Sequence, residues 1–165
     1  MPKLMLRSLL PLLMTLSLFL GGCGGTSTPT SSIPDVPDKT TATDENSVTG
    51  GSLNQYFPGD GDGYTVTFTQ EKTGFAQADL AKDGTTVGIL TINDTLNNAD
   101  AKTKFADAPM DIGGYPAVAQ GSKSTAVLVG DRFQVKANSK ADSFTSDDRE
   151  AWLGKFNLDG LAAAQ

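Results

Sequence analysis

The residue types of this chain exclude most familiar hydrolytic chemistry. The sequence contains no histidine and one cysteine, Cys23. A Ser-His-Asp triad, a Cys-His dyad and metal sites built on imidazole or thiolate ligands are therefore impossible within the chain. Carboxylate chemistry stays open, as in glycoside hydrolysis, which uses two acidic residues across a cleft. We expect a protein that is not an enzyme and holds no metal or cofactor, with a carboxylate-based hydrolase as the less favoured alternative.

Cys23 stands at the end of an apolar N-terminal stretch. Lys3 and Arg7 flank the start of an apolar run, 8–20, which is shorter than the roughly 20 residues that a membrane-spanning helix needs. The run ends in Leu20-Gly21-Gly22-Cys23, which resembles the lipobox of bacterial lipoproteins. The resemblance implies that residues 1–22 are a signal peptide, that cleavage falls between Gly22 and Cys23, and that Cys23 is lipidated.

The lipobox resemblance also implies a location. The protein is expected to be exported and anchored to the cell envelope, on the outer membrane facing the periplasm in a Gram-negative host or on the outer leaflet of the plasma membrane in a Gram-positive one. Several acyl chains bury enough methylene groups to make attachment effectively permanent. An ordinary secretory signal is the alternative, but it would leave the Cys23 thiol free in an oxidising compartment.

The charge balance limits the possible partners. The net charge is −6, and the loss of Lys3 and Arg7 with the signal peptide takes it to −8. Nucleic acid requires a basic footprint, so we expect no nucleic-acid partner. The expected partners are the membrane, through lipidated Cys23, and an envelope protein or a small ligand.

One segment reverses this acidic balance. Between Lys123 and Lys140, four basic residues are accompanied only by Asp131. Arg132, Gln134 and Lys136 alternate along an expected strand, so their side chains project from the same sheet face. This pattern predicts a binding surface for an anionic ligand or an acidic partner. The alternative is a solvated face whose basic residues prevent edge-to-edge aggregation.

Two glycine-containing motifs offer further candidates. Asp60-Gly61-Asp62-Gly63 has the alternating carboxylates of a calcium loop but lacks the remaining ligand positions, so a plain turn is favoured over a cation site. In the loop 111–116, Gly113-Gly114 precedes Tyr115 and a proline. The loop either displays Tyr115 as an interface anchor or simply connects a helix to a strand, and we favour the connection.

The chain divides into three parts by composition. After the signal peptide, residues 23–58 are rich in serine, threonine, proline and glycine, which predicts a lipidated N-terminus followed by a disordered linker. Residues 59–165 are long enough for one small core and too short for two domains. Within them, apolar alternation and Asp-Gly or Gly-Asp turns predict six strands. These are 64–69, 75–81, 87–92, 115–120, 125–129 and 132–137.

Two helices complete the expected fold. Asp94 or Thr95 is a suitable N-cap for a helix from Leu96 to Asp107, and a capping box near Thr145 predicts a second helix that carries Trp152. We expect an α+β domain in which both helices pack on one face of an antiparallel sheet and leave the other face polar. The function that fits is a lipid-anchored, non-catalytic binding or accessory domain. A structural envelope protein without a specific ligand is the alternative.

Overall fold

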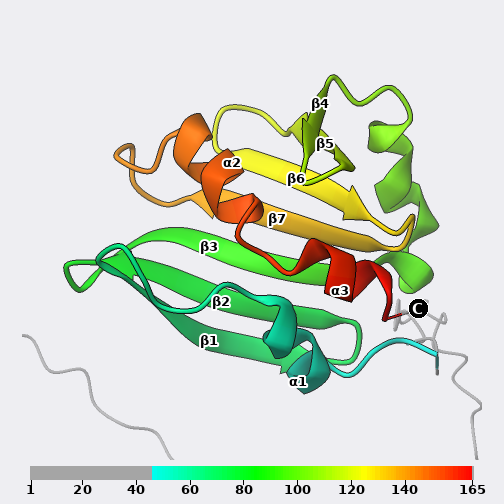
Figure 1. Ribbon diagram of the computed structural model, residues 1–165, viewed down its shortest axis with the longest axis horizontal. Helices are drawn as coiled ribbons and strands as arrows, with labels where there is room; N and C mark the ends of the chain where they lie inside the picture. The colour runs from blue at the N-terminus through cyan, green and yellow to red at the C-terminus, as the bar shows by residue number, and fades with distance from the viewer. Residues whose placement is uncertain (1–45, 165) are drawn as a thin grey trace, which may run out of the picture. The chain divides into compact units, whose positions relative to one another are not determined.

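A single antiparallel sheet organises the part of the chain that the computed structural model describes, residues 46–164 (Figure 1). Its strand order is β1-β2-β3-β7-β6-β5-β4. This architecture confirms the predicted single α+β domain, and β4 is the strand that the six expected ones did not include. The strand bounds are β1 Tyr64–Lys72, β2 Phe75–Lys82, β3 Thr85–Asp94, β4 Met110–Ile112, β5 Tyr115–Ala119, β6 Ser124–Val129 and β7 Phe133–Ser139.

Two meanders, β1 to β3 and β4 to β7, join through the antiparallel pairing of β3 with β7. The β2–β3 and β6–β7 turns occur at the predicted Asp-Gly and Gly-Asp pairs. Asp83 and Gly84 have φ values of 51° and 76°, and Gly130 and Asp131 have values of 57° and 51°. Two successive positive φ values characterise a type I′ turn, whose twist matches the strands it joins. Local turn chemistry therefore fixes how β2 meets β3 and how β6 meets β7.

Short helices cover one face of the sheet. Phe133, Val135 and Ala137 of β7 point to this face and are fully buried, together with Leu53 and with Trp152 at 4% exposure. Burial of each large side chain contributes roughly 1.5–3 kcal/mol, which makes this layer the main core. The covering elements, visible in front of the sheet in Figure 1, are α1 Gly50–Leu53, η1 Asn54–Tyr56, α2 Ser146–Leu153 and α3 Leu158–Ala162.

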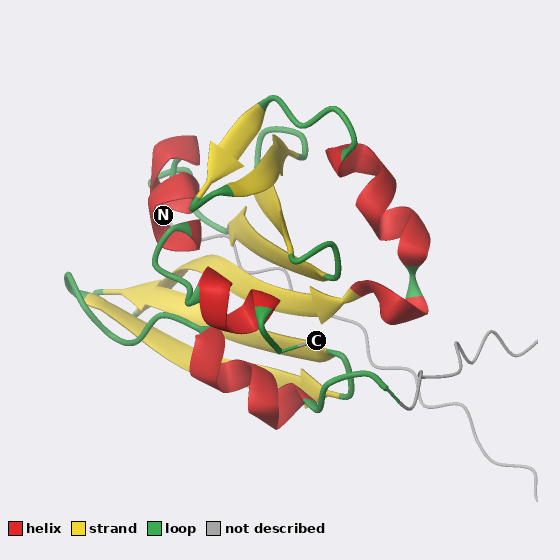
Figure 2. Ribbon diagram, turned by 45° about the vertical axis from the view of Figure 1, so that its right-hand side comes forward, coloured by secondary structure: helices red, strands yellow, loops and turns green. Residues whose placement is uncertain are grey.

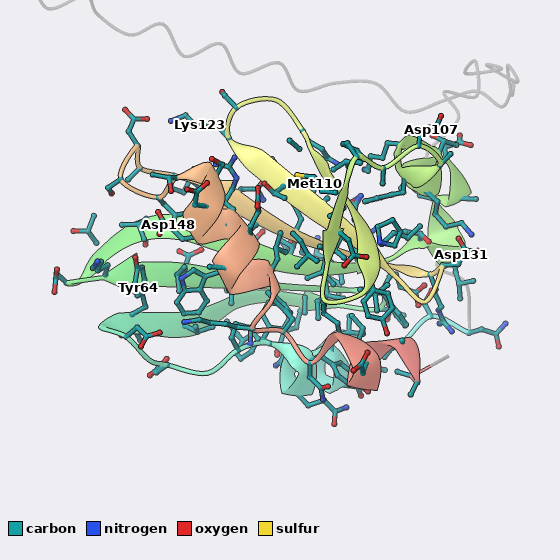
Figure 3. The ribbon with its side chains drawn as sticks, turned by 45° about the horizontal axis from the view of Figure 1, so that its top comes forward. Tyr64, Asp107, Met110, Lys123, Asp131 and Asp148 are labelled. Carbon is teal, nitrogen blue, oxygen red and sulfur yellow. The ribbon has the colours of Figure 1, made fainter. Side chains whose placement is uncertain are left out.

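Helix α2 begins with the predicted capping box. The Thr145 hydroxyl accepts a hydrogen bond from the amide of Asp148, and the Asp148 carboxylate accepts one from the amide of Thr145 at 2.8 Å. The bond from the Thr145 amide, together with one that the Thr145 hydroxyl donates to the same carboxylate at 2.7 Å, lowers the pKa of Asp148. The helix then carries Trp152 over the start of β1, where its ring lies 5.2 Å from that of Tyr64. Figure 3 shows Tyr64 below α2 and Asp148 near the start of the helix.

The predicted linker ends earlier than residue 58. Leu53 has no exposed surface, and Pro58 is buried. Gly50 lies so close to the β1–β2 hairpin that a Cβ there would sit 2.5 Å from the backbone nitrogen and oxygen of Lys72. Gly50, in the segment whose composition predicted a linker, is thus a site of close packing, whereas the space around Gly51 is open. Residues 46–58 belong to the domain, and 1–45 lie outside the described residues.

The helix predicted from Leu96 to Asp107 is replaced by two 3-10 helices, η2 (Thr95–Asn97) and η3 (Ala99–Phe105). Asp94 is the N-cap, and its carboxylate accepts a hydrogen bond from the amide of Leu96 at 3.2 Å. Asn98 has φ −154° and ψ 74°, which interrupts any α-helix between the two pieces. Asparagine side chains compete with the backbone for hydrogen bonds, and this favours such a break.

The η3 segment also packs on the face opposite to the α-helices. Phe105 contacts a small cluster with Val118, Ala126 and Leu128, whereas Val127 belongs to the main core. Successive residues of a strand point to opposite faces, so η3 covers the second face of β5 and β6. Figure 2 shows the strands of this half of the sheet between α2 and the 3-10 segment. The predicted placement of both helices on one face holds for α2 but not for this segment, and α3 on the same face as α2 was not predicted.

Candidate functional site: the second face of the sheet

The face that points away from the α-helices is polar along its central strands. On β7, Gln134 and Lys136 alternate with the buried residues of the main core. Gln134 pairs with Asn93 of β3 and Leu128 of β6, and Lys136 pairs with Thr91 and Ala126. The η3 segment covers only the side of this face formed by β5 and β6. Polar side chains from β3 and β7 therefore border the edge of η3.

Two lysines lie near that border, with Lys104 exposed and Lys136 half-buried. Lys104, the residue before Phe105 on η3, has its ammonium 5.3 Å from the centre of the Phe105 ring. Burial lowers the pKa of Lys104, and the nearby positive charge of Lys136 lowers it further. Neither lysine forms an ion pair with a described residue. Like charges that face each other destabilise a fold unless something neutralises them.

Unpaired polar atoms accumulate on the same face. Gln134 is 7% exposed, and its Nε2 has no hydrogen-bond partner among the described residues. Ser124 Oγ, on the same side of β6 as Ala126, and Gln120 Nε2, at the end of β5, are also buried and unpartnered. Leaving such a group unpaired costs about 1–3 kcal/mol. The second face thus combines unneutralised cations with unused hydrogen-bond donors.

Arg132 has a different role from the one predicted for it. Its guanidinium binds the Asp94 carboxylate through Nε at 3.1 Å and Nη2 at 2.7 Å. The Asp94 side chain is fully buried and also accepts hydrogen bonds from the amides of Val48 and Leu96. Burial alone would raise the pKa of Asp94, but these hydrogen bonds and the Arg132 charge together hold it below its ordinary value. This pair joins the end of β3 to β7 and to the N-terminal segment, where Arg132 Nη2 donates to the carbonyl of Asn46.

The predicted basic strip is therefore partly neutralised by acids from other segments. Lys123 pairs with Asp142, and Arg132 pairs with Asp94. Asp131, the one acid within the strip, pairs instead with Lys102 at 3.1 Å. Figure 3 shows Lys123 and Asp131 at opposite ends of β6. Of the candidates on β7, Gln134 and Lys136 remain together on the second face.

Tyr115 lies on the other side of the sheet from these two residues. The loop expected around it is a hairpin, in which Gly113 and Gly114 turn with φ values of 64° and 87° and β4 pairs with β5. The Tyr115 ring packs at the margin of the main core, and its hydroxyl donates to Asp159 at 2.9 Å. The structure does not bring Tyr115 together with Lys136.

The Asp60-Gly61-Asp62-Gly63 motif forms a turn. Asp62 and Gly63 have φ values of 54° and 79°, and a bridge between Gly61 and Tyr64 closes the turn. Asp60 accepts a hydrogen bond from the amide of Val66 at 2.7 Å, and Asp62 pairs with Lys155 at 2.6 Å. Within residues 46–164, no three acidic side chains gather as metal ligands would. The favoured reading of this motif as a turn agrees with the geometry.

Two shallow hollows lie next to the second face. Their volumes are about 390 and 420 Å³, and both are lined by Ala99, Lys102 and Asp131. One extends towards Arg132 and the other towards Phe105 and Leu128. The lining contains one carboxylate, already paired with Lys102, so it lacks the two acids that glycoside hydrolysis uses.

Sequence reasoning missed Lys104 because its neighbour is set by tertiary structure. Lys104 precedes Lys136 by more than thirty positions, and the helix predicted around it was expected on the opposite face. The only local signal is that Lys104 directly precedes Phe105. Because the Phe105 ring is buried on the second face, the residue next to it lies at the edge of the area that η3 covers.

No protein-family model, curated protein or solved structure gives a significant match to this chain. No helix between residues 46 and 164 is both long enough and apolar enough to cross a bilayer.

Proposed function

We propose that this protein is a lipoprotein anchored to the cell envelope through Cys23, and that its domain is a non-catalytic binding module. The anchor rests on the match of Leu20-Gly21-Gly22-Cys23 to the lipobox. The second face of the sheet, where Lys104, Lys136 and Gln134 Nε2 have no partner within residues 46–164, is the observation that carries the binding role. Unsatisfied donors and unneutralised charges are costly, and they are typical of surfaces that obtain their partners from a ligand.

The binding role is tested by cross-linking the anchored protein in its native envelope and identifying captured molecules by mass spectrometry. The expected result is a partner that is enriched with the wild type, lost with Lys136→Glu and retained with Lys140→Glu. Lys140 is a matched control because it is exposed and makes the same charge change at the end of β7. Enrichment no greater than that of an unrelated lipoprotein, or equal loss in both variants, would contradict the proposal and favour a structural envelope protein.

The anchor has a separate test. Cells fed a palmitate analogue should label the wild-type protein and fail to label Cys23→Ala. Wild-type protein that carries no label and fractionates away from membranes would exclude lipidation while leaving the binding role of the domain untouched.

A further inference from the structure

We propose that Lys104, Lys136 and Gln134 form a binding site for a phosphate-type oxyanion. The inference deepens the proposed binding function and rests on it, because it names the chemical class that the second face accepts.

The three groups come from two elements that are fixed relative to each other. Gln134 and Lys136 are two residues apart on β7 and so project side by side. Lys104 is held by its neighbour Phe105, which is 5% exposed and packs on Ala126 and Leu128. Ala126 and Leu128 are the cross-strand partners of Lys136 and Gln134. The packing of the Phe105 ring on them therefore places η3 beside the two β7 side chains. The packing of Phe105 on Ala126 and Leu128 therefore fixes the position of Lys104 relative to β7.

The charges around the site favour an anion. Lys104 lies close enough to Lys136 for their charges to repel, and no described acid neutralises either one. Asp79, which the strand register places on the same face, belongs to β2 and is two strands away from β7. A bound anion would convert this repulsion into two attractive contacts.

The hydrogen-bond inventory favours a tetrahedral oxyanion. In the described part of the chain, Gln134 Nε2 is a buried donor without an acceptor, and each ammonium has unused donors. Phosphate presents several oxygens in different directions, so each of the three donors can bind a different oxygen. Its charge of up to −2 also matches the two lysines, and charge-assisted hydrogen bonds of this kind are strong.

The test measures thermal unfolding of the mature lipidated protein in detergent, with inorganic phosphate against chloride at equal ionic strength. Phosphate at about ten times its Kd should raise Tm by about 6 °C, because it binds only the folded state. The shift should disappear in Lys104→Gln, Lys136→Gln and Gln134→Leu, and it should persist in Lys140→Gln. Each variant reports its own folding through its unfolding curve.

Two results would overturn the oxyanion site. One is the absence of a phosphate-specific shift in the wild type, and the other is an equal shift in all variants, which would indicate general screening. If either occurs while envelope capture still depends on Lys136, the oxyanion site fails and the proposed function stands. A phosphate shift without any Lys136-dependent capture would support the site and contradict the partner-binding role.

The source of the phosphate group is distinguished by a second readout. The pKa of Lys104, followed by NMR, should rise when an anion binds, with Lys140 as the internal control. In vesicles of phosphatidylcholine alone, a rise on adding inorganic phosphate identifies a soluble anion. A rise on adding phosphatidylglycerol without free phosphate identifies a lipid headgroup, and no rise under either condition overturns the site.

Discussion

The two faces of the sheet differ in whether their buried polar groups have hydrogen-bond partners among the described residues. On the α-helical face, the buried Asp94 carboxylate receives four hydrogen bonds, two of them from Arg132. On the second face, the buried Gln134 amide nitrogen has no partner among residues 46–164, and the positive charge of Lys136 lowers the pKa of Lys104. Both faces contain buried polar atoms, so burial alone does not distinguish them. The difference is whether the chain itself supplies the complementary groups.

This contrast separates stability from binding. A completed network such as that around Asp94 stabilises one arrangement, because removal of any member leaves a buried group unpaired. An incomplete set such as Gln134 with two lysines stabilises nothing by itself and gains free energy only from an external group. Substitutions should therefore weaken the fold on the first face and strengthen it, or leave it unchanged, on the second.

The largest effect is expected at Asp94. In Asp94→Asn, whichever way the amide sits, its NH₂ group faces two donors, from Arg132 and from a backbone amide, and the half-buried guanidinium loses its counter-charge. The free energy of unfolding should fall by about 3–4 kcal/mol, measured by urea denaturation. The matched control, Asp131→Asn, removes an exposed ion pair and should cost less than about 0.5 kcal/mol. Equal costs would contradict the contrast.

The same carboxylate predicts a dependence on pH. Because the folded-state pKa of Asp94 lies below its ordinary value, its stabilisation is present above the ordinary carboxyl pKa, near pH 4. The stabilisation is lost as the pH falls through the folded-state pKa. Wild-type protein should therefore lose more free energy of unfolding on acidification than Asp94→Asn does. Parallel curves for the two proteins would show that Asp94 is not stabilised as an anion.

The next largest effect is expected at Leu53, in the segment whose composition suggested a linker. Leu53→Ala leaves a cavity in the main core and should lower the free energy of unfolding by about 3 kcal/mol. Leu96→Ala makes the same change at a side chain that is 43% exposed and should cost far less. Similar small costs at both positions would mean that residues 46–58 add little to the domain.

A smaller effect of opposite sign is expected on the second face. Gln134→Leu replaces a buried amide that lacks a partner with an apolar group of similar size. It should raise the free energy of unfolding by about 1 kcal/mol in phosphate-free buffer. Gln70→Leu on the exposed strand β1 is the control and should change little. A clear loss of stability in Gln134→Leu would show that the amide has a partner in the free protein.

The smallest effect is expected at the margin of the main core. The hydrogen bond from Tyr115 to the Asp159 carboxylate raises the pKa of the phenol. Asp159→Asn should move this pKa back towards its ordinary value without a measurable change in unfolding. Ring-selective NMR can follow Tyr115 apart from Tyr56 and Tyr64, and an unchanged Tyr115 pKa would exclude the bond in solution.

Local features of this protein could be predicted because their physical causes lie within a few residues. The Asp83-Gly84 and Gly130-Asp131 turns need positive φ values that these residue types tolerate, and the Thr145 capping box closes within one helical turn. The candidate site was predicted only in part. Gln134 and Lys136 follow from alternation along β7, but their neighbour Lys104 does not.

The sequence by itself determined the lipobox resemblance, the turns, the strand alternation and the exclusion of histidine and thiolate chemistry within the domain. Tertiary structure alone decided that Asp94 meets Arg132, that Gly50 packs against Lys72, and that η3 covers the second face. Strand pairing and packing depend on partners far apart in the chain, whose proximity follows from burial of the whole core. The same packing brings Lys104 to Lys136 and leaves both without an acidic partner among the described residues.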